Sequence, residues 1–315
     1  MLGTRRMLRL APAVVALVLA APACGDSGKG KAAPIPVPRG PQTDAVTGIS
    51  EDIKGSGASF PDAFYQEAVA GLDQVAPKLR VTYESVGSAA GREAFKQGLN
   101  DFAGSDSLVD EDDGIEDGSY VYVPATAASV AVVYNLPGVD DLRLDGETLA
   151  RIYQRDITRW DDAAIVATNP GVDLPDLGIT VARRSDGSGT TKNFTKYLEA
   201  AAPDVWRLGS DDTVEWPSDT QGGQQNPGVA QIVADAAGGI GYVDLGNAVE
   251  LGMDMASIRN REGEFVAPSV GATQAALAGA ELSDDLTYDP LNGPGSGAYP
   301  ITAPTYLLVH TAYED

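Results

Sequence analysis

Residues 179–202 read ITVARRSDGSGTTKNFTKYLEAAA, a short β-branched run, then a turn rich in glycine and serine, then a run with helical spacing. The pattern predicts a strand over 179–183 and a helix over 192–202, joined by a loop whose glycines let backbone approach a ligand closely. Ser188 stands near the expected N-cap of the helix. Because a helix N-terminus combines free N–H groups with the positive end of the helix dipole, this junction suits an anion.

Two earlier segments repeat this chemistry between a predicted strand and a predicted helix. They read GSGASFP at residues 55–61 and GSAAG at residues 87–91. A serine before a helix usually serves only as a cap. Three such junctions in one chain, the last of which also carries Arg183 and Arg184, favour an anion site. None of them is a nucleotide loop, because the glycine spacing and the Lys-Ser/Thr ending of such loops are missing.

The chain alternates short β-like runs with helical runs from Ile53 onward. Strands are predicted over 81–83, 121–134, 179–183, 240–243 and 305–309, with Pro124 interrupting the second. Helices are predicted over 89–99, 149–153, 163–167, 192–202, 229–237 and 273–280. This alternation predicts an α/β fold in which helices cover a mostly parallel sheet. A chain of 315 residues, 43% of them hydrophobic, can form one large domain or two ordinary ones.

The first 24 residues predict export. Three arginines precede an apolar run at residues 10–19 that is too short to span a bilayer well, and small residues then lead to Cys24. Cys24 is the only cysteine and stands where a bacterial lipoprotein carries its acylated N-terminus. We expect a signal peptide over 1–24 with lipoprotein-type cleavage before Cys24 and lipidation of Cys24; the alternative is ordinary cleavage after residues 21–23. Residues 25–49, rich in Gly, Pro and Lys, predict a flexible tether.

Charge and composition exclude several classes of protein. The whole chain carries a formal charge of −23, and removal of residues 1–24 with their three arginines leaves 19 − 45 = −26. This acidity argues against nucleic acid as a partner. A single histidine, His310, and a single cysteine exclude Cys-rich metal centres and most His-based ones, so we predict no metal and no cofactor. The acidic run 110–114 lacks the spacing of an EF-hand and predicts a solvated loop.

Four motifs occur together in one order. They are GSGASFP (55–61), VGSAAG (86–91), GSD (104–106) and RSDGSGT (184–190), supported by ITRWDD (157–162), NPG (169–171), GIGYV (239–243) and YPI (299–301). Their order and spacing resemble those of the periplasmic phosphate-binding proteins, the PstS family, which are the substrate-binding components of phosphate ABC importers. The resemblance covers residues 53 to 310.

The resemblance implies a type II periplasmic-binding-protein fold, in which two α/β lobes joined by hinge strands close on one dehydrated phosphate in a cleft between them. Lobe I would comprise residues 50–125 and about 301–315, and lobe II about 126–300. In the family further helices follow the last strand, so we expect these C-terminal helices to be absent from a chain that stops at Asp315. We expect an exported monomer, anchored to the outer face of the cell membrane as a lipoprotein or periplasmic. Its implied partners are inorganic phosphate and the permease subunits of a phosphate ABC transporter.

The resemblance also implies a set of phosphate-binding residues. Most would donate hydrogen bonds, from hydroxyls, amides and one guanidinium, while Asp106 would be the one acceptor. The implied ligands are Ser59, Phe60, Ser88, Asp106, Arg184, Ser188, Gly189 and Thr190, and Asp186 would orient Arg184 from behind.

A buried acceptor discriminates between oxyanions. Phosphate retains at least one proton at neutral pH, whereas sulfate retains none. The Asp106 carboxylate can accept a hydrogen bond from that proton, but it would face sulfate as a second unpaired negative group. Leaving a buried polar group unpaired costs about 1–3 kcal/mol, and sites built around a specific hydrogen bond can discriminate by about 10⁴–10⁵.

The sequence alone leaves three other functions open. The protein could bind another tetrahedral oxyanion, hydrolyse a substrate through Ser59 or Ser188, or present a surface to a partner without any pocket. Hydrolysis would need a base or a metal cluster, and one histidine with scattered carboxylates offers neither convincingly. We assign His310 a structural role and the three tryptophans a packing role. No catalytic residue is predicted.

Overall fold

The computed structural model describes residues 40–313. The predicted signal peptide, the lipidation site Cys24 and most of the predicted tether lie outside the described residues. Pro41–Val46, which the sequence places in the tether, form helix α1. Proline favours the first position of a helix, because it has no N–H to leave unpaired. Val46 packs against a small core of Val75, Ala76 and Leu79, so the folded body begins before residue 50.

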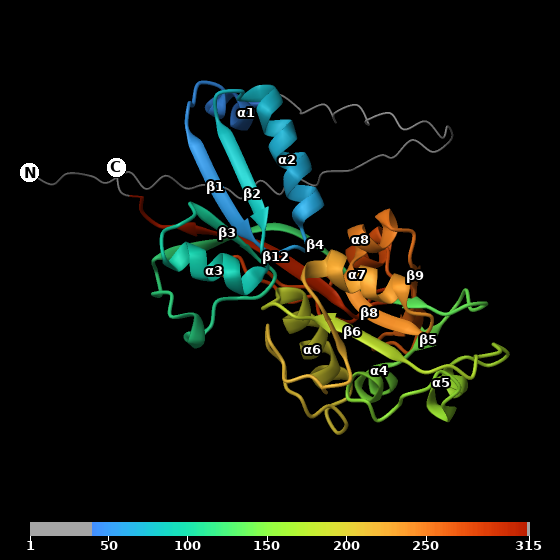
Figure 1. Cartoon of the computed structure of the whole chain (residues 1–315). Coiled ribbons are helices and arrows are strands. Elements are labelled where there is room, and N and C mark those ends of the chain that lie inside the picture. Colours follow the sequence, from blue (N-terminus) through green and yellow to red (C-terminus); the bar gives the residue numbers. More distant parts are fainter. Residues whose placement is uncertain (1–39, 314–315) are drawn as a thin grey trace, which may run out of the picture. The chain divides into compact units, whose positions relative to one another are not determined.

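Within the described residues, the main sheet has nine strands, in the order β2-β1-β3-β12-β4-β8-β6-β7, with β9 paired to β4 (Figure 1). These strands are β1 (Asp52–Gly57), β2 (Arg80–Ser85), β3 (Phe102–Ser105), β4 (Tyr120–Asn135), β6 (Thr180–Arg184), β7 (Gln221–Gly223), β8 (Gly239–Asp244), β9 (Asp254–Met255) and β12 (Thr302–His310). A three-stranded sheet contains β5 (Arg143–Leu144), β10 (Ser257–Arg259) and β11 (Phe265–Val266).

The strand directions differ from the mostly parallel sheet that the sequence predicts. β1 is parallel to β2 and β3, and β6 is parallel to β7 and β8. Between these two parallel groups stand β4 and β12, which run antiparallel to each other and to their outer neighbours β8 and β3. Hydrophobic patterning predicts a strand but not its direction, and this explains the difference. The sheet therefore consists of two parallel halves joined through two long antiparallel strands.

β4 is one continuous strand of 16 residues, although Pro124 lies inside it. Its register with β12 shifts between Thr305 and Tyr306, and Tyr306 is the residue that pairs with Pro124. Proline cannot donate a ladder hydrogen bond and is tolerated in sheets at such irregular positions. The predicted interruption is thus a local irregularity, and β4 passes from one half of the sheet to the other without a break.

Helices cover both halves of the sheet. The helices of the first half are α2 (Asp62–Val75) and α3 (Ser88–Lys96); those that follow β4 are α4 (Gly146–Tyr153), α5 (Ala163–Thr168), α6 (Gly189–Ala201), α7 (Gln225–Asp235), α8 (Leu245–Glu250) and α9 (Val270–Leu277). α3 packs on β1 and β3, and α7 packs on β6, β7 and β8 (Figure 1). Within residues 40–313, no helix combines the length and the apolar character needed to cross a membrane.

The largest hydrophobic core lies in the half that contains β6 and β8. Trp160 and Trp206 are buried in it, and Trp216 packs against it, which confirms the packing role predicted for the tryptophans. Phe194 on α6 stacks on Tyr242 of β8, with 4.4 Å between ring centroids. This contact fixes α6 on the sheet, and α6 is the helix that begins at the third glycine-serine junction.

Candidate anion-binding site

The three glycine-serine junctions meet at one place in the fold. The Gly189 amide of the third junction donates to Ser88 Oγ of the second at 3.1 Å. The first junction is linked to the third through Asn226 at the start of α7, whose amide donates to Ser59 Oγ at 3.4 Å and whose Oδ1 accepts from Arg184 Nη1 at 3.3 Å. Ser59 and Ser88 belong to the β1–β3 half, whereas Gly189 and Asn226 belong to the β6–β8 half. The cluster therefore lies where the two halves touch.

Two glycines allow the backbone segments of the cluster to approach each other closely, and one aromatic ring anchors the first junction. Gly57 has a φ of +148°, and a Cβ on it would lie 2.0 Å from the Gly104 carbonyl oxygen. A Cβ on Gly189 would lie 2.7 Å from the Asp106 Cβ. Phe60 follows Ser59 and places its buried ring in the largest core cluster. Backbone approach at the glycines and the Phe60 anchor hold the first and third junctions against their neighbours.

Arg184 ends β6 and is buried between two acceptors. Its Nε donates to Asp186 Oδ1 at 2.8 Å, its Nη2 pairs with Asp186 Oδ2, and its Nη1 donates to Asn226 Oδ1 at 3.3 Å. Burial alone would raise the pKa of Asp186, but the hydrogen bonds and the charge of Arg184 lower it overall. The Arg184 amide donates to the Tyr242 hydroxyl at 3.2 Å, which ties the junction to the core. Asp186 thus fixes the plane of the guanidinium group.

Asp106 follows β3 and is almost completely buried. Thr305 Oγ1 donates to its Oδ1 at 2.7 Å, and no hydrogen bond from the described residues reaches its Oδ2. Its carbonyl oxygen accepts from Asn193 Nδ2 of α6 at 2.6 Å. Burial raises the pKa of the Asp106 carboxyl to about 7, although the Thr305 hydrogen bond and the Arg184 charge both act to lower it. One carboxylate oxygen is therefore left to accept a further hydrogen bond.

The hydroxyl groups of the cluster share a pattern. In three serines a backbone N–H already donates to Oγ: Asn226 to Ser59 at 3.4 Å, Gly189 to Ser88 at 3.1 Å and Thr191 to Ser188 at 3.3 Å. Among the described residues no acceptor takes the proton of any of these three hydroxyls. Thr190 Oγ1 is buried and has no hydrogen-bond partner within the described part of the chain. The site thus presents four hydroxyl groups whose protons are free to donate.

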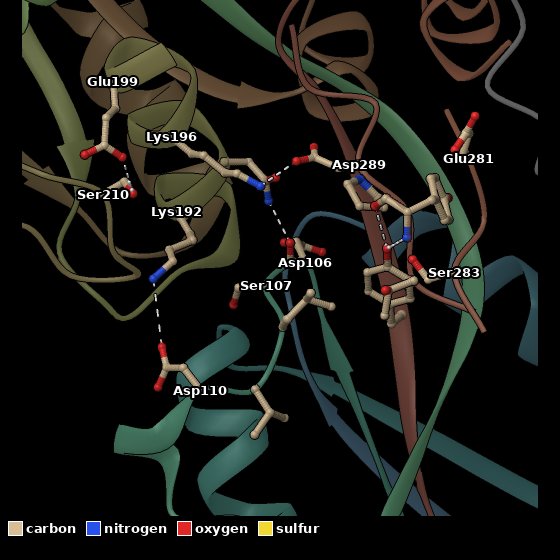
Figure 2. Close-up of a pocket in the computed structure, with 17 residues that line it drawn as sticks. Asp106, Ser107, Asp110, Lys192, Lys196, Glu199, Ser210, Glu281, Ser283 and Asp289 are labelled. Carbon is tan, nitrogen blue, oxygen red and sulfur yellow. Dashed lines mark hydrogen bonds and ion pairs between the residues drawn. The ribbon is translucent and has the colours of Figure 1, made fainter. Parts of the chain in front are cut away.

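A cavity of about 610 Å³ lies beside this cluster (Figure 2). Asp106 and Asn193 line it, as do Lys192 and Lys196 of α6. Lys196 pairs with Asp289 at 2.6 Å, and Lys192 lies 3.8 Å from Asp110. Further carboxylates on the wall are Glu199 and Glu281. Because the acidic groups outnumber the lysines, which are themselves paired, the cavity is poorly suited to an anion, and the candidate site is the buried cluster.

Hydrolysis through a serine would need a base or a metal cluster beside the hydroxyl. His310 stacks on Phe95 with 3.7 Å between ring centroids, in agreement with its predicted structural role. Within residues 40–313, no group of three or more His, Cys, Asp or Glu residues could hold a metal ion. Within the described residues, no hydrogen bond joins the Oγ of Ser59, Ser88 or Ser188 to a histidine or a carboxylate, which is the contact that activates a serine nucleophile.

Comparison with known proteins identifies the family. A family model described as a PBP superfamily domain matches residues 42–315. The phosphate-binding protein PstS of Xylella fastidiosa is 36% identical over 272 residues, which are 84% of this chain and 74% of that protein. PstS of Methanocaldococcus jannaschii is 35% identical over 82% of this chain and 72% of its own length. The chain belongs to the PstS family.

Solved structures show the same fold. A periplasmic phosphate-binding protein named PfluDING, solved with bound phosphate, covers 84% of this PstS-family chain and 82% of its own, with a TM-score of 0.66 and 23% identity. A phosphate-binding protein from Stenotrophomonas maltophilia covers 84% and 80%, with a TM-score of 0.64 and 22% identity. The two halves of the sheet are therefore the two lobes of a periplasmic-binding fold, as predicted.

The structure brings together the residues predicted to bind phosphate, with Asp186 beside them, whereas the predicted lipidation site Cys24 lies outside the described residues. Those predicted as ligands are buried and lie in or beside the meeting junctions: Ser59, Phe60, Ser88, Asp106, Arg184, Ser188, Gly189 and Thr190. Sequence reasoning missed Asn226, which accepts from Arg184 and whose Nδ2 has no partner in the described part of the chain. It also missed Thr305. Neither residue carries a local signal, because each acts only through partners distant in the sequence.

Proposed function

We propose that this PstS-family chain binds inorganic phosphate outside the cytoplasm and delivers it to an ABC importer. The names of its relatives support the ligand. The observation that carries the proposal is the set of free hydroxyl protons. Ser59, Ser88 and Ser188 come from three separate junctions, each accepts a backbone N–H, and each keeps its own proton for an acceptor. Together with Thr190, they form a donor set that an oxyanion satisfies.

In this proposal charge contributes less than hydrogen bonding. Among the described residues, Arg184 is the only cation bonded within the cluster, and it is already paired with the Asp186 carboxylate. Binding would come from the guanidinium, the hydroxyls and the amides at the N-terminus of α6, in a buried place where such bonds are stronger than in water. The overall negative charge of the protein does not oppose this, because charges beyond about 8 Å are largely screened at 0.15 M salt.

Asp106 would select the protonated oxyanion. One of its oxygens is occupied by Thr305 and the other accepts no bond from the described residues, so that oxygen can receive the proton of phosphate. Sulfate brings no proton and would leave two negative oxygens facing each other. Discrimination by about 10⁴–10⁵ is within reach of a site built around one specific hydrogen bond.

Calorimetric titration tests the ligand and the role of Asp106. We expect one phosphate per chain to bind tightly at pH 8 without turnover, and sulfate to bind at least about 10³-fold more weakly. Asp106→Asn removes the charge and adds an N–H donor, so it should reduce this preference at least about tenfold. Asp112→Asn, in the exposed acidic run, is the matched control and should change nothing. Equal binding of sulfate by the unmodified protein would make the chain a general oxyanion binder, and phosphate release from an ester would make it a hydrolase.

We also propose a division of the chain and a location. The lobe boundaries would fall near residues 125/126 and 300/301, because the chain passes into lobe II along β4 and returns to lobe I just before β12 begins at Thr302. Cys24 would carry the lipid that holds the exported monomer at the outer face of the membrane, near the permease subunits. Mass spectrometry of the mature N-terminus tests the anchor: a diacylglyceryl-modified Cys24 is expected, and an unmodified terminus at any other residue would contradict it.

A further inference from the structure

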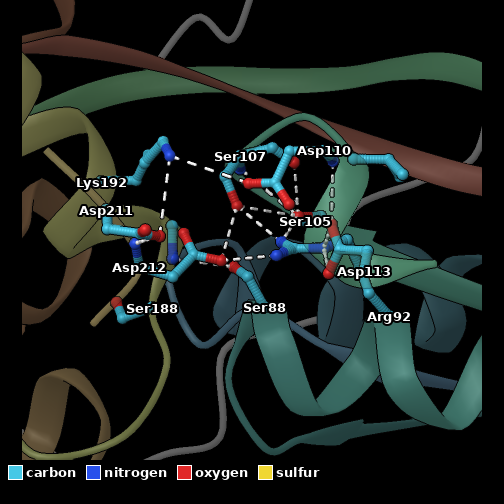
Figure 3. Close-up of polar contacts among 12 residues, drawn as sticks. Ser88, Arg92, Ser105, Ser107, Asp110, Asp113, Ser188, Lys192, Asp211 and Asp212 are labelled. Atoms are coloured by element: carbon cyan, nitrogen blue, oxygen red, sulfur yellow. Dashed lines mark hydrogen bonds and ion pairs between the residues drawn. The ribbon is translucent and has the colours of Figure 1, made fainter.

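Arg92 is a buried charged residue outside the phosphate-binding set. It lies on α3, the helix that begins at Ser88, and its side chain is only 4% exposed. Nε donates to both oxygens of Asp113 at 2.9 Å, and Nη1 donates to Ser107 Oγ at 2.6 Å and to Ser105 Oγ at 3.0 Å (Figure 3). These partners all belong to lobe I. The acidic run predicted to be fully solvated therefore has one residue, Asp113, bound to a buried arginine.

The last partner of Arg92 belongs to the other lobe. Nη2 donates to Asp212 Oδ2 at 2.6 Å, and Asp212 follows α6 in lobe II. The same carboxylate oxygen accepts from Ser107 Oγ at 3.1 Å. The Asp212 backbone carbonyl accepts from the Ser188 amide at 3.0 Å. One lobe II residue therefore contacts both the buried cation of lobe I and the N-cap serine of the phosphate loop.

The network flanks the proposed proton acceptor on both sides. Ser105 and Ser107 are the immediate neighbours of Asp106, and both accept from Arg92 Nη1. Arg92 thus fixes the segment that carries Asp106, while Asp212 fixes the segment that carries Ser188. The Asp212 charge also raises the pKa of Asp106, after the larger effect of burial. The Arg92–Asp212 contact therefore links the segment of lobe I that carries Asp106 to the loop of lobe II that carries Ser188.

The two ends of the ion pair behave differently when the lobes separate. Arg92 would keep Asp113, Ser105 and Ser107, because these residues belong to its own lobe. Asp212 would lose Arg92 and Ser107 together, and its Oδ1 has no partner within the described residues even in the arrangement seen here. Burial opposes the charge of Arg92, but the Asp212 and Asp113 carboxylates raise its pKa overall, so Arg92 stays charged. The contact would therefore be gained on closure, and its loss would not leave Arg92 as a lone buried cation, because Asp113 stays bonded to it.

We propose that Arg92 and Asp212 form an interlobe latch that positions the phosphate loops and slows phosphate release. The inference rests on the proposed function. Removing one partner of a buried ion pair has a much larger effect than removing an exposed pair. The Lys192–Asp110 pair also joins the lobes, but its charged atoms are 3.8 Å apart and its side chains are 30% and 46% exposed. It therefore serves as an exposed pair with which the buried Arg92–Asp212 pair can be compared.

Stopped-flow phosphate kinetics test the latch. Asp212→Asn keeps the shape and removes the charge. We expect phosphate dissociation to speed up at least about tenfold, while association changes less than about threefold, because a latch that forms after encounter acts on the closed complex. Lys192→Gln removes the exposed interlobe pair and should change both rate constants less than about twofold. A dissociation rate in Asp212→Asn within twofold of the unmodified protein would overturn the latch.

A second pair of measurements separates a positioning role from a folding role. In a double-mutant cycle of Arg92→Gln and Asp212→Asn, the effects on phosphate affinity should be strongly non-additive, and additive effects would contradict the latch. X-ray scattering of the phosphate-free proteins should show a larger mean radius in Asp212→Asn than in Lys192→Gln. If the unmodified protein binds no phosphate, the proposed function fails. The latch is then judged by scattering alone, and equal radii would reject it.

Discussion

Thr305 donates its hydroxyl proton to Asp106 Oδ1 over 2.7 Å, although the two residues are 199 positions apart in the chain. Thr305 lies on β12, one of the two strands that join the lobes. The proposed proton acceptor is thus held by a connecting strand as well as by its own loop. The bond also gives the two carboxylate oxygens different roles. Oδ1 accepts the hydrogen bond from Thr305, whereas Oδ2 accepts none from the described residues and would receive the proton of the ligand.

Replacement of Thr305 tests this division. Thr305→Val keeps the shape and removes the hydroxyl, which leaves a buried carboxylate oxygen unpaired. An unpaired buried group costs about 1–3 kcal/mol, so we expect phosphate affinity at pH 8 to fall by about 5- to 150-fold. Calorimetry measures the change, and Thr305→Ser, which keeps the hydroxyl, should stay within about threefold of the unmodified protein. A Val variant that binds as tightly as the Ser variant would show that the bond does not matter.

The raised pKa of Asp106 predicts a pH-dependent loss of selectivity. Burial raises the pKa of this carboxyl to about 7 in the empty site, so the group becomes protonated as the pH falls through 7. A protonated carboxyl can donate to sulfate, whereas the ionised form repels it. Sulfate affinity should therefore rise about tenfold between pH 8 and pH 5, with most of the gain above pH 6.

The matched variant isolates the group responsible. Asp106→Asn cannot titrate, so its sulfate affinity should be flat between pH 8 and pH 5. Calorimetric titrations with sulfate at four pH values compare the two proteins. If sulfate binding by the unmodified protein is also flat, or if it weakens as the pH falls, Asp106 does not control the choice of oxyanion.

Paired arginines at the end of β6 offer a comparison within one dipeptide. Arg184 holds Asp186 and Asn226 with its planar guanidinium, whereas Arg183 bonds to Thr220 Oγ1 at 3.4 Å and to the Arg184 carbonyl. Arg184→Lys loses the two-point contact with Asp186, and hydrogen bonds of charged groups contribute about 1.5–3 kcal/mol. We expect phosphate affinity to fall at least about tenfold in Arg184→Lys and less than threefold in Arg183→Lys, measured by calorimetry. Equal losses would place the ligand elsewhere on this loop.

Much of the fold follows from local sequence. The third junction shows why: a β-branched run, a glycine-serine turn and an N-cap serine are enough to predict β6 and α6 within a few residues, and Ser188 does cap α6 by accepting from Thr191. The same local signals predict that Ser59, Ser88 and Ser188 precede or begin helices. That these serines converge came only from the family resemblance, since no local rule brings residues of two lobes together.

The remaining features depend on contacts between distant segments. β12 pairs antiparallel with β3 and β4, and the amino-acid pattern of a strand does not record the direction of its neighbours. Arg92 and Asp212 look like ordinary surface charges on the sequence, because the partners that they bond in the folded protein lie 13 to 120 positions away in the chain. Asn226 lies in the first turn of α7 and gains its role only because the fold brings that turn beside Arg184, 42 positions away in the chain. Local sequence therefore indicates the candidate binding segments, whereas contacts between the lobes determine which other side chains support those segments.

Gly189 gives a test of lobe contact that involves no charge. A Cβ there would lie 2.7 Å from Asp106 Cβ and 2.8 Å from the Ser107 amide nitrogen, and Asp106 and Ser107 belong to the opposite lobe. Gly189→Ala should therefore hinder closure while each lobe stays folded. Overpacking costs about 1–3 kcal/mol, which corresponds to a loss of phosphate affinity of about 5- to 150-fold.

The control for Gly189→Ala is Gly271→Ala on α9, where a Cβ would have no neighbour within 4 Å. Alanine is favoured over glycine inside a helix, so this variant should bind phosphate normally and unfold at a slightly higher temperature. For Gly189→Ala we expect an unfolding temperature close to that of the unmodified protein without phosphate, but a clearly smaller rise when phosphate is added. A full phosphate-induced rise in Gly189→Ala would mean that the lobes do not close on the ligand at this contact, because the added methyl group leaves no room for the arrangement seen here.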